Sequence, residues 1–203
     1  MRIGTMFLGR VEALENESVQ TKFFVFGVPI APVASYYATG ETGNGVQGIE
    51  IPVHGTSVLA GYLRMGTFLV ALLCGIFGWI EHRSYDPQYG LFGVTAIATI
   101  GWALSMFAIG RLSQSERTRR ERLREATGIG APPELLPDDV RGEIEAKLEL
   151  RWAHVSDDTS GGRDWKTRLR GGQARRDELA TLYALAEYSA DPELVAIAAR
   201  QIA

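Results

Sequence analysis

Two apolar stretches, Val58–Ile80 and Leu91–Gly110, are joined by a short loop, residues 81–90. A helix needs about 20 apolar residues to cross a hydrocarbon core that is about 30 Å thick. The second stretch has no charged residue, and the first has only Arg64, near its start. A buried core helix in a soluble domain is the alternative, but both stretches are apolar all round. The pattern therefore predicts a transmembrane helical hairpin.

Charged side chains are almost absent from the predicted hairpin. We expect the stem of Arg64 to lie along the first helix while its guanidinium reaches the lipid headgroups. The two stretches hold no Asp, Glu, Lys or His, which disfavours an ion path built from charged groups. A neutral pore lined by Thr95, Thr99 and Ser105 stays open as an alternative, although such hydroxyls usually bond to their own helix backbone.

A cluster of arginines after the second stretch predicts the orientation of the hairpin. The linking loop holds only Arg83 as a fixed cation, against Glu81 and Asp86, and segments rich in arginine stay in the cytoplasm. We therefore expect both termini in the cytoplasm, in a multi-pass protein of the bacterial inner (plasma) membrane. The cluster either contacts anionic lipid headgroups or serves only as a topology signal on a solvated helix. Its members are Arg111, Arg117, Arg119, Arg120, Arg122 and Arg124.

Small residues recur at a spacing of four in both stretches, as Ala71 with Gly75 and as Gly101 with Ser105. Small residues let membrane helices approach closely, because apolar burial gives little drive for association in lipid. The two helices of one hairpin could pack together through them, or several copies could form a homo-oligomer. We slightly prefer self-association.

Residues 1–57 read as a small antiparallel β lobe, because β-branched and aromatic residues recur between turn signals. Prolines remove hydrogen-bond donors from a sheet, so we expect Gly27–Pro32 to interrupt the pairing. Thr56 or Ser57 is expected to cap the first membrane helix. The predicted strands are Thr5–Leu14, Ser18–Phe26, Val33–Thr39 and Val46–Val53.

Gly43–Gly48 matches the Gly-x-Gly-x-x-Gly pattern of dinucleotide-binding proteins. That site needs a strand before the glycines and a helix after them, so that the helix N-terminus faces the pyrophosphate. Here a predicted strand follows. We interpret the glycines as part of a hairpin loop.

Short segments of the first half of the chain resemble a set of small bacterial membrane proteins of unknown function. The resemblance covers roughly residues 4–110. It implies an N-terminal β lobe followed by a two-helix membrane hairpin, and it implies no catalytic or ligand residues. The segments that carry it are Gly4-Thr5, Gly9, Thr21-Lys22-Phe23-Phe24, Pro29-Ile30-Ala31-Pro32 with Ser35-Tyr36, and Ile51-Pro52.

The rest of the chain is expected to be helical. Residues 111–127 should form a basic juxtamembrane helix that continues the second membrane helix and stops at Gly128. Residues 128–203 should form a cytoplasmic helical bundle, with Asp164 and Asp191-Pro192 starting two of its helices. Trp152 and Trp165 could clamp a ligand, but core anchoring is the better interpretation.

Residues with catalytic or metal-binding chemistry are sparse. The histidines, His54, His82 and His154, lack metal-ligand spacing, and Cys74 is the single cysteine. No nucleophile elbow or phosphate loop is present, and a net charge of −3 gives no sign of nucleic-acid binding.

These observations predict an α+β membrane protein with no cofactor and no enzymatic activity. It would be an interaction or assembly module anchored in the lipid bilayer and bound to an unidentified cytoplasmic or membrane protein. A channel or transport component and an accessory subunit of a membrane enzyme remain the alternatives.

Overall fold

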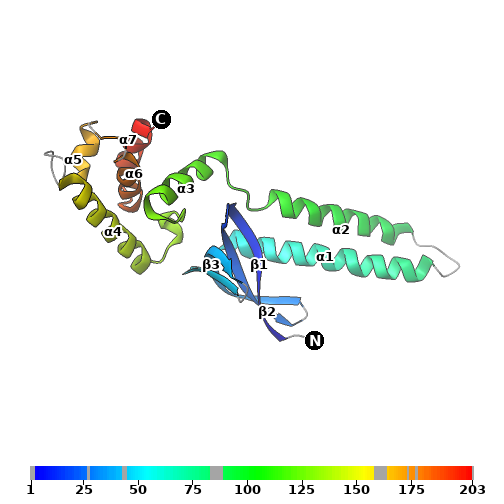
Figure 1. The fold of residues 1–203 in the computed structure, drawn as a ribbon. Helices are drawn as coiled ribbons and strands as arrows, with labels where there is room; N and C mark the ends of the chain where they lie inside the picture. The colour runs from blue at the N-terminus through cyan, green and yellow to red at the C-terminus, as the bar shows by residue number, and fades with distance from the viewer. Residues whose placement is uncertain are drawn as a thin grey trace. The chain divides into compact units, whose positions relative to one another are not determined.

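The computed structural model describes residues 3–26, 28–42, 45–82, 89–157, 164–172, 174–176 and 178–202. These residues form one four-stranded antiparallel sheet and seven α-helices (Figure 1). The chain divides into two compact units, Met1–Leu112 and Ser113–Ala203. The α+β class that the sequence predicts, with an antiparallel sheet near the N-terminus, is confirmed.

The sheet is a simple meander in which each strand pairs with the next along the chain, in the order β1-β2-β3-β4. One of its most deeply buried side chains is Phe23, which lies under the first long helix and packs edge-on against Tyr62, with 5.2 Å between ring centroids. The strands are β1 (Ile3–Leu14), β2 (Glu17–Phe26), β3 (Val28–Thr42) and β4 (Gly45–Ile51).

Strand β3 runs through the two prolines that were expected to interrupt it. Pro29 lies opposite Val25, and Pro32 lies opposite Phe23. The register of the β2–β3 pair shifts on both sides of Phe23-Phe24. Such shifts let a strand bend while the proline positions go without a ladder hydrogen bond. The pairing is therefore irregular at the prolines, as predicted, but the strand does not stop there, because local bulges accommodate them.

Strand β1 is irregular where it crosses the first long helix. Its register with β2 shifts after Leu8, at Gly9, which has a φ of +71°. A Cβ at Gly9 would collide with the backbone carbonyl of Ser57. The hydroxyl of Ser57 donates to the carbonyl of Gly9 at 2.7 Å and accepts from the hydroxyl of Thr21 at 2.9 Å. This contact fixes the strand on the helix.

Two long helices, α1 (Gly55–His82) and α2 (Tyr89–Ala108), follow the sheet. The predicted cap at Thr56 or Ser57 is wrong, because α1 already begins at Gly55. By length and composition both helices can cross a membrane, and only 6% of the most apolar window of each is buried within the described chain. A core helix of a soluble protein would be mostly buried.

The small residues of the two long helices lie partly where α1 and α2 meet. A Cβ at Gly75 would be 3.6 Å from the methyl group of Thr95, and one at Gly101 would be 3.9 Å from the methyl group of Thr67. Ala71 and Gly75 also line a shallow hollow of about 320 Å³ on α1. Contacts inside one hairpin thus account for both glycines, and self-association stays a prediction.

Arg64 on α1 binds three backbone carbonyls of its own unit. Its guanidinium donates to the carbonyls of Ser105 at 3.3 Å and Ile109 at 3.3 Å, and to that of Arg10 on β1 at 2.7 Å. Carbonyls at the end of a helix lack intrahelical partners and carry partial negative charge. The structure thus gives Arg64 a different role from the predicted reach to headgroups, because it joins α1, the end of α2 and β1.

Replacing Arg64 with lysine is expected to destabilise the first unit by about 1–2 kcal/mol. The lysine ammonium keeps the charge, but it lacks the planar fork that reaches three carbonyls at once. The measurement is the thermal unfolding midpoint of the full chain in detergent. The exposed Arg117 supplies the matched control, Arg117→Lys. Equal midpoints for the two variants would contradict the assigned role.

The second long helix does not continue into the arginine cluster, so that prediction is wrong. Helix α2 ends at Ala108, and the chain turns at Gly110, which has a φ of +76°. The carbonyl of Gly110 accepts from the N–H of Glu12 on β1 at 2.6 Å. A new helix, α3 (Gln114–Thr127), then starts after Ser113, whose hydroxyl accepts from the N–H of Glu116. Helix α3 stops, as predicted, at Gly128.

The second unit consists of helices and the loops that join them, with no strand among its described residues. Helix α6 is its centre, since every residue from Thr181 to Tyr188 is buried. Trp152 and Trp165 are 3% and 8% exposed, which confirms that they anchor the core. The predicted start signals are also confirmed, because carboxylates of Asp164 and Asp191 accept from N–H groups in the first turns of their helices. After α3 the elements are η1 (Pro133–Leu135), α4 (Asp138–Asp157), α5 (Trp165–Arg170), α6 (Leu179–Tyr188) and α7 (Pro192–Ile202).

Candidate functional site

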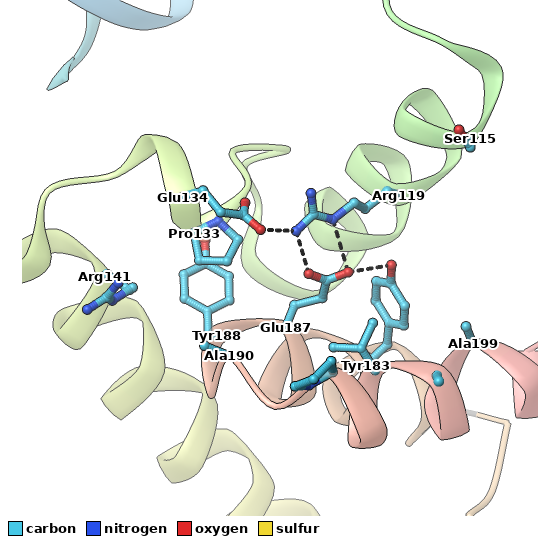
Figure 2. Close-up of a pocket in the computed structure, with 13 residues that line it drawn as sticks. Ser115, Arg119, Pro133, Glu134, Arg141, Tyr183, Glu187, Tyr188, Ala190 and Ala199 are labelled. Carbon is cyan, nitrogen blue, oxygen red and sulfur yellow. Dashed lines mark hydrogen bonds and ion pairs between the residues drawn. The ribbon is translucent and has the colours of Figure 1, made fainter. Parts of the chain in front are cut away.

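An open groove of about 710 Å³ lies on the second unit, lined by residues of α3, η1, α4, α6 and α7 (Figure 2). We call it the helical groove. Its apolar lining consists of two tyrosine rings and small or cyclic side chains: Pro133, Tyr183, Tyr188, Ala190, Pro192, Val195, Ala196 and Ala199. Its polar lining consists of Ser115, Arg119, Glu134, Arg141 and Glu187.

The buried carboxylate of Glu187 organises the polar side of the groove. Arg119 donates to its two oxygens, from Nε at 3.0 Å and from Nη2 at 2.6 Å, and the hydroxyl of Tyr183 donates at 2.7 Å (Figure 2). The same Nη2 reaches Glu134 at 2.6 Å. Two-pronged bonds between arginine and a carboxylate are among the stronger polar contacts in proteins. The cluster therefore holds α3, η1 and α6 together.

These contacts and the burial of the side chains shift the pKa values of Arg119 and of the two tyrosines of the groove. The hydrogen bond to Glu187 raises the pKa of Arg119, so the guanidinium stays charged at any ordinary pH. Burial, followed by the hydrogen bond to Glu187, raises the pKa of Tyr183. Burial also raises the pKa of Tyr188, whose hydroxyl donates to the carbonyl of Ala131 at 3.2 Å. Both phenols are thus held neutral.

Tyr183 is expected to ionise only above pH 10, the ordinary value for a phenol. Its folded pKa lies above its unfolded pKa, so its contribution to stability is complete below about pH 10 and is lost as pH rises through the folded value. The measurement is the phenolate absorbance of the full chain against Tyr183→Phe, with folding followed by circular dichroism. A difference spectrum that placed this ionisation at or below pH 10 in the folded chain would contradict the geometry.

The six arginines that could contact lipid differ in their exposure and in their contacts within the structure. Arg111 and Arg117 are exposed, so lipid contact remains a prediction for them. Arg119 is bound to Glu187, and Arg122 lies over the ring of Tyr183, 5.6 Å from its centroid. Arg124 is half-buried.

Arg120 is the most deeply buried arginine of the cluster, at 2% exposed. Its Nε donates to the carboxylate of Glu116 at 3.1 Å. Four of the six arginines thus make contacts within the second unit or are partly buried there, and the choice between lipid contact and a topology signal stays a prediction.

The histidines of the chain do not join other possible ligands into a metal site within the described residues. Nowhere in the described ranges do three or more His, Cys, Asp or Glu side chains come together to hold a metal ion. His54 instead lies 3.5 Å from the carboxylate of Glu12, and His154 is exposed. The glycine-rich segment leads into a strand and not into a helix, as predicted, but β4 already begins at Gly45, so Gly45 and Gly48 lie in the strand and not in a loop. Gly43 and Asn44 lie outside the described residues. The loop cation Arg83 also lies outside them.

Comparisons with protein families, with curated proteins and with solved structures found no match for this chain. The helical groove was not visible in the sequence, because its polar centre joins Arg119 to Glu187, 68 positions further along the chain. Only the local signals, such as the apolar stripe of α7, are readable without the fold.

Proposed function

We propose that this chain is a double-spanning membrane protein that carries the helical unit as an interaction module. The observation that supports it most is the exposed apolar surface of α1 and α2, for example Ile97 at 72%, Trp79 at 64% and Phe107 at 64%. Soluble monomers rarely expose continuous apolar surface of this extent. A lipid bilayer would cover it without a protein partner.

The proposed location is the bacterial inner (plasma) membrane, with both termini in the cytoplasm. The support is the difference in positive charge between the two sides of the hairpin. Six arginines follow α2 within residues 111–124, whereas residues 81–90 contain one. Positively charged flanks of membrane helices stay on the cytoplasmic side. The β lobe and the helical unit would then both face the cytoplasm.

The helical groove would bind a segment of a partner protein rather than a substrate. Its open surface combines apolar side chains with the Arg119–Glu187 pair and two tyrosines, and apolar, tyrosine and arginine side chains are typical of protein-recognition sites. The Arg119–Glu187 contact engages both groups, so in this proposal the pair shapes the groove.

The hydrogen bonds of the hydroxyl groups on α2 weigh against the alternative of a neutral pore. The hydroxyl of Thr95 donates to the carbonyl of Leu91 at 2.9 Å, and that of Thr99 donates to the carbonyl of Thr95 at 2.7 Å. The hydroxyl of Ser105 likewise donates to the carbonyl of Trp102. The hydroxyl protons are thus used within α2, which favours the interaction module over a pore.

Site-specific photo-crosslinking in living cells tests the proposal. A photoreactive phenylalanine at Ala196, in the helical groove, is expected to capture one main partner protein. The same group at Lys147, exposed on α4 and outside the groove, is the matched control. A second substitution, Ala199→Trp, fills the groove and should abolish the adduct. Identical adducts from both positions, or an adduct that Ala199→Trp leaves unchanged, would contradict a binding role for the groove.

A further inference from the structure

We infer that one end of the β sheet is inserted into the lipid–water boundary beside α1. This apolar sheet end consists of Met6 on β1, Phe24 and Phe26 on β2, and Val28, Ile30 and Val33 on β3. The inference rests on the proposed membrane insertion of α1 and goes beyond it, because it assigns the lipid surface to a part of the β lobe.

The first support is the composition of the β2–β3 hairpin. The sequence has no charged residue between Lys22 and Glu41. Strands that face water on one side normally alternate apolar and polar residues. Here consecutive apolar residues, such as Phe23-Phe24-Val25-Phe26, occupy both faces of β2. Such a strand suits surroundings that are apolar on both sides.

The second support is the exposure of the six side chains of the apolar sheet end. The six side chains of the apolar sheet end are between 41% and 55% exposed, including Ile30 at 53% and Val33 at 55%. They do not lie scattered over the unit, because Phe26 pairs with Val28, and Phe24 pairs with Ala31 next to Ile30. A patch of this size on a domain in water is costly and marks a surface that something covers.

The third support is position along α1. The hydroxyl of Tyr62 donates to the carbonyl of Ile30 at 2.9 Å, and the ring of Phe23 packs on the same tyrosine. The apolar sheet end therefore lies beside the second turn of α1. Figure 1 shows the strands near the start of this helix. On that turn Leu59 and Leu63 are themselves 54% and 39% exposed. Tyrosine is enriched at this level of membrane helices.

The neighbouring turn of α1 is what assigns lipid to the apolar sheet end. A hollow of about 490 Å³ between β1, α1 and α2 includes none of the six side chains of this end, and Arg10, Gln20 and Arg64 make part of its lining polar. The exposed Leu59 and Leu63 lie on the turn beside the sheet end and would enter the bilayer with α1. This neighbourhood is why we assign lipid, and not a partner protein, to the apolar sheet end.

Backbone polarity limits the insertion to the lipid–water boundary. Hydrogen-bonding groups that enter the hydrocarbon must be paired within the protein. Strands β1, β2 and β3 pair with one another along this end, but the outer edge of β1 has no strand beside it among the described residues, and β4 reaches only as far as Ser35 on β3. In the uncovered part of β3, Pro29 and Pro32 have no N–H to leave unpaired, and Tyr62 satisfies the carbonyl of Ile30.

Spin-label accessibility in vesicles tests the inference. Full-length protein with Cys74→Ser is labelled through one new cysteine, at Ile30, at Ile97 or at Gln47, and reconstituted in vesicles of zwitterionic and anionic phospholipid. Oxygen concentrates in lipid, whereas a nickel chelate stays in water. We expect the oxygen-to-nickel collision ratio at Ile30 to exceed that at Gln47, on the exposed strand β4, several-fold.

The label at Ile97, on α2, separates the two proposals. A lipid-like ratio at Ile97 together with a water-like ratio at Ile30 would overturn the insertion of the sheet end and leave the membrane hairpin intact. Low collision rates with both reagents at Ile30 would also overturn it, because they would show that protein covers the patch. A water-like ratio at Ile97 would overturn the membrane hairpin and, with it, the inference.

Discussion

Replacing Gly9 with alanine is expected to unfold the first unit or to prevent its accumulation. The φ of +71° at this position costs an alanine about 1–2 kcal/mol. The new Cβ would also collide with the carbonyl of Ser57, which is rigid backbone of α1, and overpacking of this kind costs about 1–3 kcal/mol. Together these penalties reach the lower end of the stability of a domain, which is about 5–15 kcal/mol.

Amide hydrogen exchange followed by mass spectrometry measures this effect in the full chain. Peptides from β2 (Glu17–Phe26) should lose their protection in Gly9→Ala, while peptides from α6 should keep it. Gly4→Ala is the matched control, because a Cβ at Gly4, on the same strand, would meet nothing within 4 Å. Wild-type protection of β2 in Gly9→Ala would show that the strand does not sit on α1 in this way.

Replacing Glu187 with leucine is expected to destabilise the second unit by roughly 2–4 kcal/mol. The side chain is 5% exposed and accepts hydrogen bonds from Arg119 and Tyr183. Its loss leaves a buried phenol without a partner and a guanidinium, 26% exposed, with only Glu134 and Glu116 beside it. Glu187→Gln should cost less, since it keeps an acceptor for the phenol.

The measurement is again hydrogen exchange, here of peptides from α6. Glu143→Gln is the control, because it breaks an exposed ion pair with Lys147 that should contribute about 0.3–0.5 kcal/mol. A double-mutant cycle that combines Glu187→Leu with Arg119→Met isolates the coupling between these two side chains. Equal effects of Glu187→Leu and Glu143→Gln would contradict the central role of this carboxylate.

Features that depend on nearby residues could be predicted from the sequence. Apolar runs identify α1 and α2 because hydropathy is a local property. Asp191-Pro192 marks the start of α7 for the same reason, since a cap acts within one turn. The break before α3 also had a local signal that was missed. Ser113 with Glu116 three positions later is the pattern of a capping box, and the glycine at 110 precedes it.

Features that join distant segments could not be predicted in this way. Arg64 appeared as an isolated cation in an apolar helix, because its carbonyl partners lie on β1 and at the end of α2. Arg119 appeared as part of a topology signal, since Glu187 is far along the chain. The expectation that the strand would stop at the prolines of β3 failed for another reason. Proline disfavours pairing on average, but the bulges of the β2–β3 pair accommodate it.

Cysteine labelling with a membrane-impermeant maleimide tests the central claim that α1 and α2 span the membrane and hold the helical unit in the cytoplasm. Full-length protein with Cys74→Ser carries one new cysteine, at Ser84 between the two helices or at Glu193 on α7. In intact spheroplasts we expect Ser84→Cys to be labelled, and Glu193→Cys to be labelled only after permeabilisation. Equal labelling of both before permeabilisation, the reverse pattern, or recovery of the chain in the soluble fraction would contradict the account.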